Sequence, residues 1–88
     1  MRRFTIPPVT ISLDGAKATI LEISKVELDE ETRFYIVTCY IEYNNYKSKI
    51  FTLQVSNNKE LVEKLRCEIA KMKWMLRLGH TYLFERTK

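Results

Sequence analysis

Apolar residues at odd-numbered positions run through the first two-thirds of the chain, and this alternation constrains the fold most strongly. Successive side chains of a β-strand point to opposite faces of a sheet, so a period of two predicts strands with one apolar face. The residues concerned are Val9, Ile11, Leu13, Leu21, Ile23, Val37, Cys39, Ile41, Phe51, Leu53 and Val55. If every turn has an odd length, they all share one face of an antiparallel meander.

Turn-forming residues divide this region into strands. Asp14-Gly15 and Asn44-Asn45 are typical of tight turns, because Gly and Asn accept positive φ. The acidic stretch Asp29-Glu30-Glu31 is predicted to be a solvated turn. The expected strands are residues 9–13, 17–27, 33–43 and 46–55.

One turn leaves an alternative open. A strict two-residue turn at Asn44-Asn45 would break the odd-numbered register, because it would place Phe34 and Ile36 opposite Val55 and Leu53. We favour the odd-numbered face, since it gives one continuous apolar surface.

The last third predicts a long helix. Ser56-Asn57-Asn58 is a typical N-cap cluster, residues 59–78 follow without proline or glycine, and Gly79 fits the position after the C-cap. Six apolar residues fall within an arc of about 100°: Leu61, Val62, Leu65, Ile69, Met72 and Leu76. We therefore predict a single α+β domain over residues 1–88, with a four-stranded antiparallel meander and one long C-terminal helix packed on a sheet face (β-β-β-β-α). Residues 81–84 would form a short fifth strand or a docked tail.

A second apolar strip lies on the opposite side of this helix. Cys67, Trp74 and Leu78 are spaced by seven and four residues, which puts them on one line. We interpret the strip as a partner surface, joined by Tyr82 and Phe84, for a homodimer of antiparallel helices or for another protein. Two alternatives stay open: the tail covers Trp74 and Leu78, or these are ordinary isolated apolar residues on a surface.

The net charge of +4 comes entirely from the last quarter of the chain. Residues 1–68 carry ten basic and ten acidic residues, whereas residues 69–88 carry five basic residues against Glu85 alone. Cations near a helix C-terminus also suit its dipole, which is the simpler interpretation. The second hypothesis is nucleic-acid binding. The residues it would use are Arg66, Lys73 and Arg77 on one helix flank and the basic residues of the C-terminal tail, with Lys47 and Lys49 near Tyr40 and Tyr46.

The motifs of common chemistries are not found in the sequence. His80 is the only histidine, Gly15 and Gly79 are the only glycines, and the two cysteines show no metal-ligand or disulfide spacing. We expect no enzymatic activity, catalytic residue, metal, cofactor or small-molecule substrate, and the chain has no apolar run of about 20 residues for a membrane span. A cytoplasmic protein is expected. The Lys- and Glu-rich charge, with Gln54 as the only glutamine, is typical of thermophilic proteins.

Overall fold

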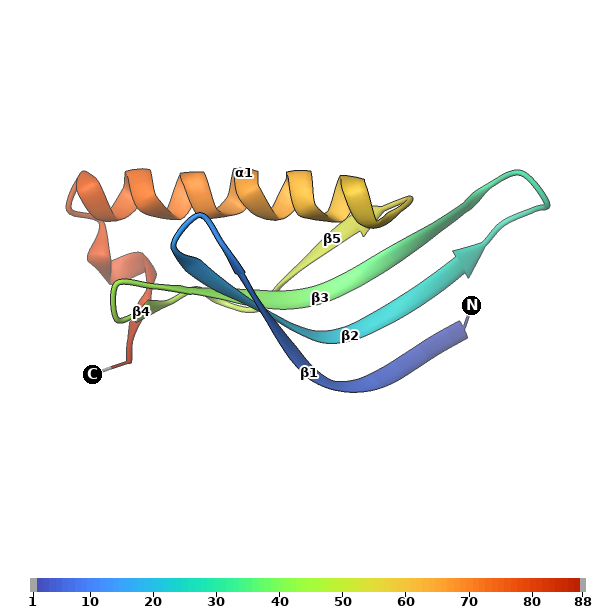
Figure 1. Ribbon diagram of the computed structural model, residues 1–88, viewed down its shortest axis with the longest axis horizontal. Coiled ribbons are helices and arrows are strands. Elements are labelled where there is room, and N and C mark those ends of the chain that lie inside the picture. The colour runs from blue at the N-terminus through green and yellow to red at the C-terminus, as the bar shows by residue number, and fades with distance from the viewer. Residues whose placement is uncertain (1, 88) are drawn as a thin grey trace.

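The computed structural model describes residues 2–87, and it describes their side chains from residue 8 onward. It has an antiparallel sheet with one α-helix across one face, which confirms the predicted α+β class (Figure 1). The elements are β1 (Arg2–Leu13), β2 (Ala16–Glu27), β3 (Arg33–Tyr43), β4 (Tyr46–Lys47), β5 (Phe51–Val55), α1 (Asn58–Arg77), the 3₁₀ turn η1 (Thr81–Leu83) and β6 (Glu85–Arg86). The strand order is β1-β2-β3-β4-β6, and β5 pairs with β3 beyond the end of β4.

Two hairpins in the sheet have two-residue turns. The φ angles are 50° and 81° at Asp14-Gly15 and 51° and 67° at Asn44-Asn45. Positive φ at both central residues is the requirement of the type I′ turn, which follows the natural twist of a hairpin. The flanking pairs are Leu13 with Ala16 and Tyr43 with Tyr46. Each turn therefore pairs an odd-numbered residue with an even-numbered one.

Two interruptions of the strand pairing restore pairs in which both residues are odd-numbered or both are even-numbered. In β2 the register shifts by one residue between Ile20 and Glu22. Between β4 and β5 it shifts again at residues 48–50, so that Cys39 pairs with Phe51. At the second shift, Ser48 donates its backbone N–H to the carbonyl of Ile41 (2.8 Å), and its hydroxyl accepts the N–H of Ile41 (2.9 Å). An extra residue in one strand, as in a β-bulge, returns the odd-numbered residues to the core face.

The predicted register is therefore right in part of the sheet. Along β3 and β5 the odd-numbered residues Val37, Cys39, Ile41 and Val55 are buried, and Val55 faces Tyr35 rather than Phe34. The prediction is wrong for the first half of β2, where the buried apolar residues are the even-numbered Ala16, Ala18 and Ile20. The two-residue turn after β1 puts them on the core face, and the shift after Ile20 returns Ile23 to it, opposite Val37.

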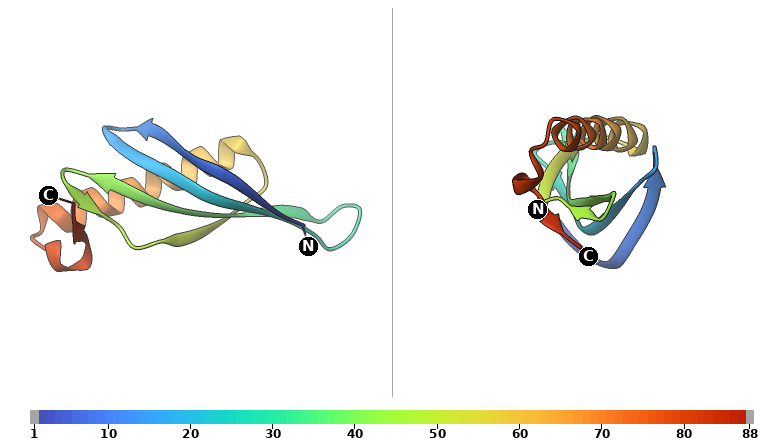
Figure 2. Two further views of the ribbon diagram at one scale, coloured as in Figure 1. Left: turned by 90° about the horizontal axis from the view of Figure 1, so that it is seen from below. Right: turned by 90° about the vertical axis from the view of Figure 1, so that its left-hand side faces the viewer.

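The helix α1 covers the core face of the sheet with one row of side chains. Leu61, Leu65, Ile69 and Met72 are buried, at spacings of four, four and three residues. Of the six predicted residues, Val62 and Leu76 are partly buried. Figures 1 and 2 show α1 lying along one side of the sheet, with no described element against the other side.

Both ends of α1 are capped by side-chain or backbone hydrogen bonds. At the start, the Asn57 side chain accepts the N–H of Glu60 (2.8 Å), and Lys64 lies 3.1 Å from the Glu60 carboxylate, which lowers the pKa of Glu60. At the end, Gly79 has φ +89° and donates to the carbonyl of Leu76. His80 donates to the carbonyl of Met75, which completes a Schellman motif and turns the chain back toward the sheet.

The C-terminal tail docks on the edge of the sheet. β6 pairs with β4, Thr87 donates its N–H to the carbonyl of Asn45 (2.8 Å), and Phe84 packs against the core. In Figure 1 this segment descends from the end of α1 to β4. Of the two alternatives expected for residues 81–84, the docked tail is right and the strand is wrong: these residues form η1 and Phe84, and the strand β6 follows at Glu85–Arg86.

Truncation of the buried helix row should destabilise the whole domain. Ile69 is 1% exposed, so Ile69→Ala should lower the free energy of unfolding by about 2–5 kcal/mol through lost burial and a residual cavity. Lys59→Ala, at an exposed position of the same helix, should change it by less than about 0.5 kcal/mol. Urea unfolding followed by circular dichroism measures both. Equal stability of the two variants would contradict this packing.

Candidate interaction surface on the outer face of the helix

The outer strip consists of Cys67, Ala70, Trp74 and Leu78, which lie on the side of α1 turned away from the sheet. Their spacings of three, four and four residues place them on one line along the helix. Trp74 is 57% exposed, Leu78 is 64% exposed, and Cys67 and Ala70 also belong to the exposed class. Among residues 2–87, no segment lies against this side of the helix in Figures 1 and 2.

Ala70 was not singled out by the sequence pattern, yet it shapes the strip. Ala70, Lys73, Trp74 and Arg77 line a hollow of about 160 Å³ on the helix surface. These four residues are at positions i, i+3, i+4 and i+7, which is the arrangement that receives a side chain from a facing helix in a coiled coil. The sequence feature that could have identified Ala70 is its small side chain, one helical turn before the only tryptophan.

The two tail residues of the predicted surface have different environments. Tyr82 is 78% exposed, and its hydroxyl lies 3.2 Å from Nδ1 of His80, with the two rings in edge contact. Phe84 instead packs against the core and fastens the tail. The tail folds back toward β4 and leaves Trp74 and Leu78 more than half exposed. It therefore does not provide the cover that the alternative interpretation expected.

The basic flank of α1 is partly occupied by contacts within the chain. Nε of Arg66 lies 3.8 Å from the carboxylate of Asp14, and Lys73 donates to the backbone carbonyl of the same residue. Lys73 also lies 5.2 Å from the centre of the Tyr43 ring. These contacts attach the β1–β2 turn to the helix. Arg77 stacks on Trp74, with 5.6 Å between the guanidinium carbon and the ring centre.

The lysines on the sheet lie apart from this flank. Lys47 lies opposite Glu42 and 4.3 Å from the centre of the Tyr40 ring, on the sheet face turned away from α1. Lys49 is exposed in the interruption between β4 and β5. Tyr46 does not join Tyr40, because it pairs with Tyr43 and packs against the core. Among the five predicted nucleic-acid contacts, the structure thus separates the two lysines near β4 from the three cations of α1.

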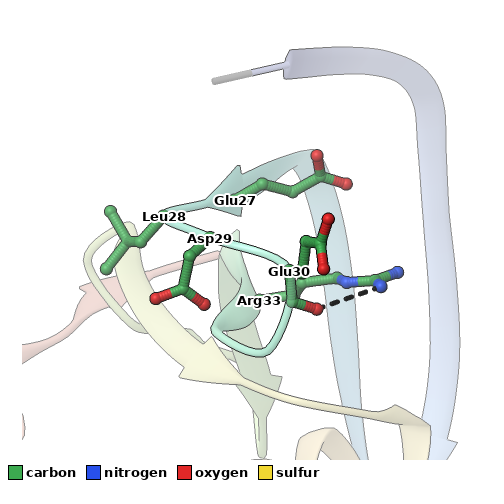
Figure 3. Close-up of a pocket in the computed structure, with 5 residues that line it drawn as sticks. All are labelled: Glu27, Leu28, Asp29, Glu30 and Arg33. Carbon is green, nitrogen blue, oxygen red and sulfur yellow. Dashed lines mark hydrogen bonds between the residues drawn. The ribbon is translucent and has the colours of Figure 1, made fainter.

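The acidic β2–β3 turn forms a shallow hollow with Glu27, Leu28, Asp29, Glu30 and Arg33, shown in Figure 3. The Asp29 carboxylate accepts the N–H groups of Thr32 (2.6 Å) and Glu31 (2.9 Å), and these hydrogen bonds lower the pKa of Asp29. Arg33 donates to the backbone carbonyl of Glu30 (3.2 Å). In Figure 3 the Asp29 carboxylate points away from those of Glu27 and Glu30, so the three groups do not converge on one point.

Other chemistry is sparse in the part of the chain that the structure describes. Within residues 2–87 no group of three His, Cys, Asp or Glu side chains lies close enough to hold a metal ion. No helix in that range has the length and apolarity needed to cross a membrane.

The two thiols have different environments, since Cys39 is buried and Cys67 is exposed. Burial, with a smaller effect of the negative charge of Glu68, raises the pKa of Cys39 to about 11.

Thiol labelling should distinguish the two cysteines. At about pH 8, near the ordinary thiol pKa, maleimide at low chain concentration should modify Cys67 quickly and Cys39 only after denaturation, because the thiolate is the reactive form. Mass spectrometry counts the adducts, and Cys67→Ser serves as the control that should show no fast adduct. Two fast adducts on the folded wild-type chain would contradict the burial of Cys39.

Comparison of the chain with models of known protein families, with curated protein sequences and with solved structures finds no match in any of the three. What the molecule binds is therefore inferred from its own surface. On that surface the largest apolar side chains of α1 that face away from the core are Trp74 and Leu78.

Proposed function

We propose that this protein is a non-enzymatic assembly module that forms a homodimer through the outer strip of α1. One observation carries the proposal: Trp74 and Leu78 are 57% and 64% exposed on the outer side of the helix, because the tail of the same chain folds back toward β4 instead of covering them. Aromatic residues at the centre of a surface patch are typical of the residues that supply most of the binding energy in protein interfaces.

The energy available from this strip is large enough to matter. A buried aromatic side chain removes on the order of 150–250 Å² from water, so more than half of Trp74 leaves roughly 100 Å² for a partner. At about 25 cal/mol per Å² this is ~2.5 kcal/mol for each copy. Leu78 adds to it, and Met75, 39% exposed, lies at the margin of the strip.

A second copy of the chain suits this surface because the surface carries both halves of a contact. The indole of Trp74 projects from the strip, and the small side chains of Cys67 and Ala70 lie on the same line. A two-fold axis can place the indole of each copy against these small side chains of the other. The domain also has little burial of its own: its radius of gyration is 14.1 Å, against roughly 12 Å for a compact chain of this length.

Replacement of Trp74 by a charged residue tests the homodimer. By sedimentation velocity, the wild-type protein should have twice the chain mass of 10.5 kDa, and Trp74→Glu should be monomeric with an unchanged circular dichroism spectrum. Ile50→Glu is the matched control, because Ile50 is 60% exposed at the interruption between β4 and β5 and should leave the dimer intact. A wild-type protein that is monomeric at micromolar concentrations would refute the homodimer.

Nucleic-acid binding is the second candidate, and the concentration of positive charge near the end of α1 favours it. Arg66 has a side chain 58% exposed, and that of Lys71 is 70% exposed. Such a surface would contact phosphates without regard to sequence, and its affinity would fall steeply with salt.

A salt titration tests the second candidate. Fluorescence anisotropy with labelled single- and double-stranded DNA and RNA should show binding at about 50 mM salt that weakens as salt rises. Arg66→Glu combined with Arg77→Glu should weaken it much more than Lys49→Glu, which lies between β4 and β5, outside α1. Absence of binding at about 50 mM salt would eliminate this candidate.

A further inference from the structure

Three residues of α1 define how two copies would meet. Glu63, Ala70 and Arg77 are spaced by seven residues, which is nearly two full helical turns, so they form one row at the side of the outer strip. The acidic residue and the basic residue are each about 10.5 Å along the axis from Ala70, on opposite sides of it. Ala70 has the smallest side chain of the row, so another helix can approach most closely there.

Neither charged end of this row has an ion-pair partner among the described residues. Glu63 is exposed and makes no ion pair with any described residue. Arg77 makes no ion pair with any described residue, and its guanidinium lies over the Trp74 ring. By contrast, Glu60, Lys64, Glu68 and Lys71 are paired within the helix. Within this row, Glu63 and Arg77 thus present an unpaired negative and an unpaired positive charge at equal distances from a small residue.

We infer that the two helices of the homodimer run antiparallel, with the two-fold axis passing beside Ala70 and Glu63 of each copy opposite Arg77 of the other. This inference rests on the homodimer proposed above and specifies its geometry. An antiparallel pair makes two opposite-charge contacts, whereas a parallel pair would place Glu63 beside Glu63 and Arg77 beside Arg77. Like charges in contact across an interface are strongly unfavourable, so the row selects the antiparallel arrangement.

The same arrangement gives the rest of the strip suitable neighbours. With Ala70 at the axis, Trp74 of one copy lies at the level of Arg66 and Cys67 of the other. The indole then packs against a small side chain and the stem of an arginine, a favourable contact for an aromatic ring. Ala70 of each copy faces Ala70 of the other at the closest point, where helix axes are typically 8–10 Å apart.

A charge swap tests the contact between Glu63 and Arg77. Glu63→Arg and Arg77→Glu should each raise the dimer Kd by about tenfold or more, because each creates two like-charge contacts. The double variant should return Kd to within about threefold of the wild-type value, since opposite charges again face each other. Arg86→Glu, which makes the same charge change on the tail, should leave Kd unchanged. Failure of the double variant to recover would overturn the inference.

Cross-linking tests the position of the axis independently. On a Cys67→Ser background, Ala70→Cys should form an intermolecular disulfide under mild oxidation, because the two residues meet at the axis. In the wild-type dimer the two Cys67 residues would be about 9 Å apart along the axis, so they should not cross-link. Non-reducing electrophoresis separates the results: cross-linking through Cys67, or none through Ala70→Cys in a proven dimer, overturns the antiparallel geometry. A wild-type monomer would instead refute the homodimer itself.

Discussion

The strict alternation of side chains in a β-strand is the constraint on which the rest of this structure depends. The sheet can receive α1 only if its apolar residues stay on one face from β1 to β5. The two tight turns, at Asp14-Gly15 and Asn44-Asn45, would each move the odd-numbered residues of the following strand to the other face of the sheet. The register shifts after Ile20 and at residues 48–50 cancel both moves. The continuous surface under the helix results from this cancellation.

The helix that covers this surface has two sides with different roles. Its inner row, from Leu61 to Met72, is inaccessible to solvent, and its basic flank is attached to the first hairpin through Asp14. These contacts fix the rotation of the helix about its own axis. The direction in which Trp74 and Leu78 point is therefore set by the core rather than by the strip itself. A surface held in this way is preorganised, which reduces the cost of binding.

Much of the fold could be predicted from the sequence, because the strand and helix periods are clear and the caps are explicit. Asn57 and Gly79 limit the helix as expected, and Val37, Cys39 and Ile41 lie in the core as expected. The burial of Ala16 and Ala18 follows from the two-residue turn at Asp14-Gly15, whereas the shift after Ile20 could not be predicted, since a bulge depends on pairing with another strand. The contact between Lys73 and Asp14 joins residues 59 positions apart. No local pattern in the sequence encodes that contact. Ala70, by contrast, lies one helical turn before Trp74, so its place beside the tryptophan could have been found from local spacing.

The extra residue between β4 and β5 has a consequence for how such a chain can vary. Five steps along the chain separate Tyr46 from Phe51, whereas four separate their partners Tyr43 and Cys39. Loss of one residue near Ser48 would therefore straighten the strand and keep Phe51 opposite Cys39, with Val55 still on the core face. Chain length at this site can thus change by one residue without a change in the core.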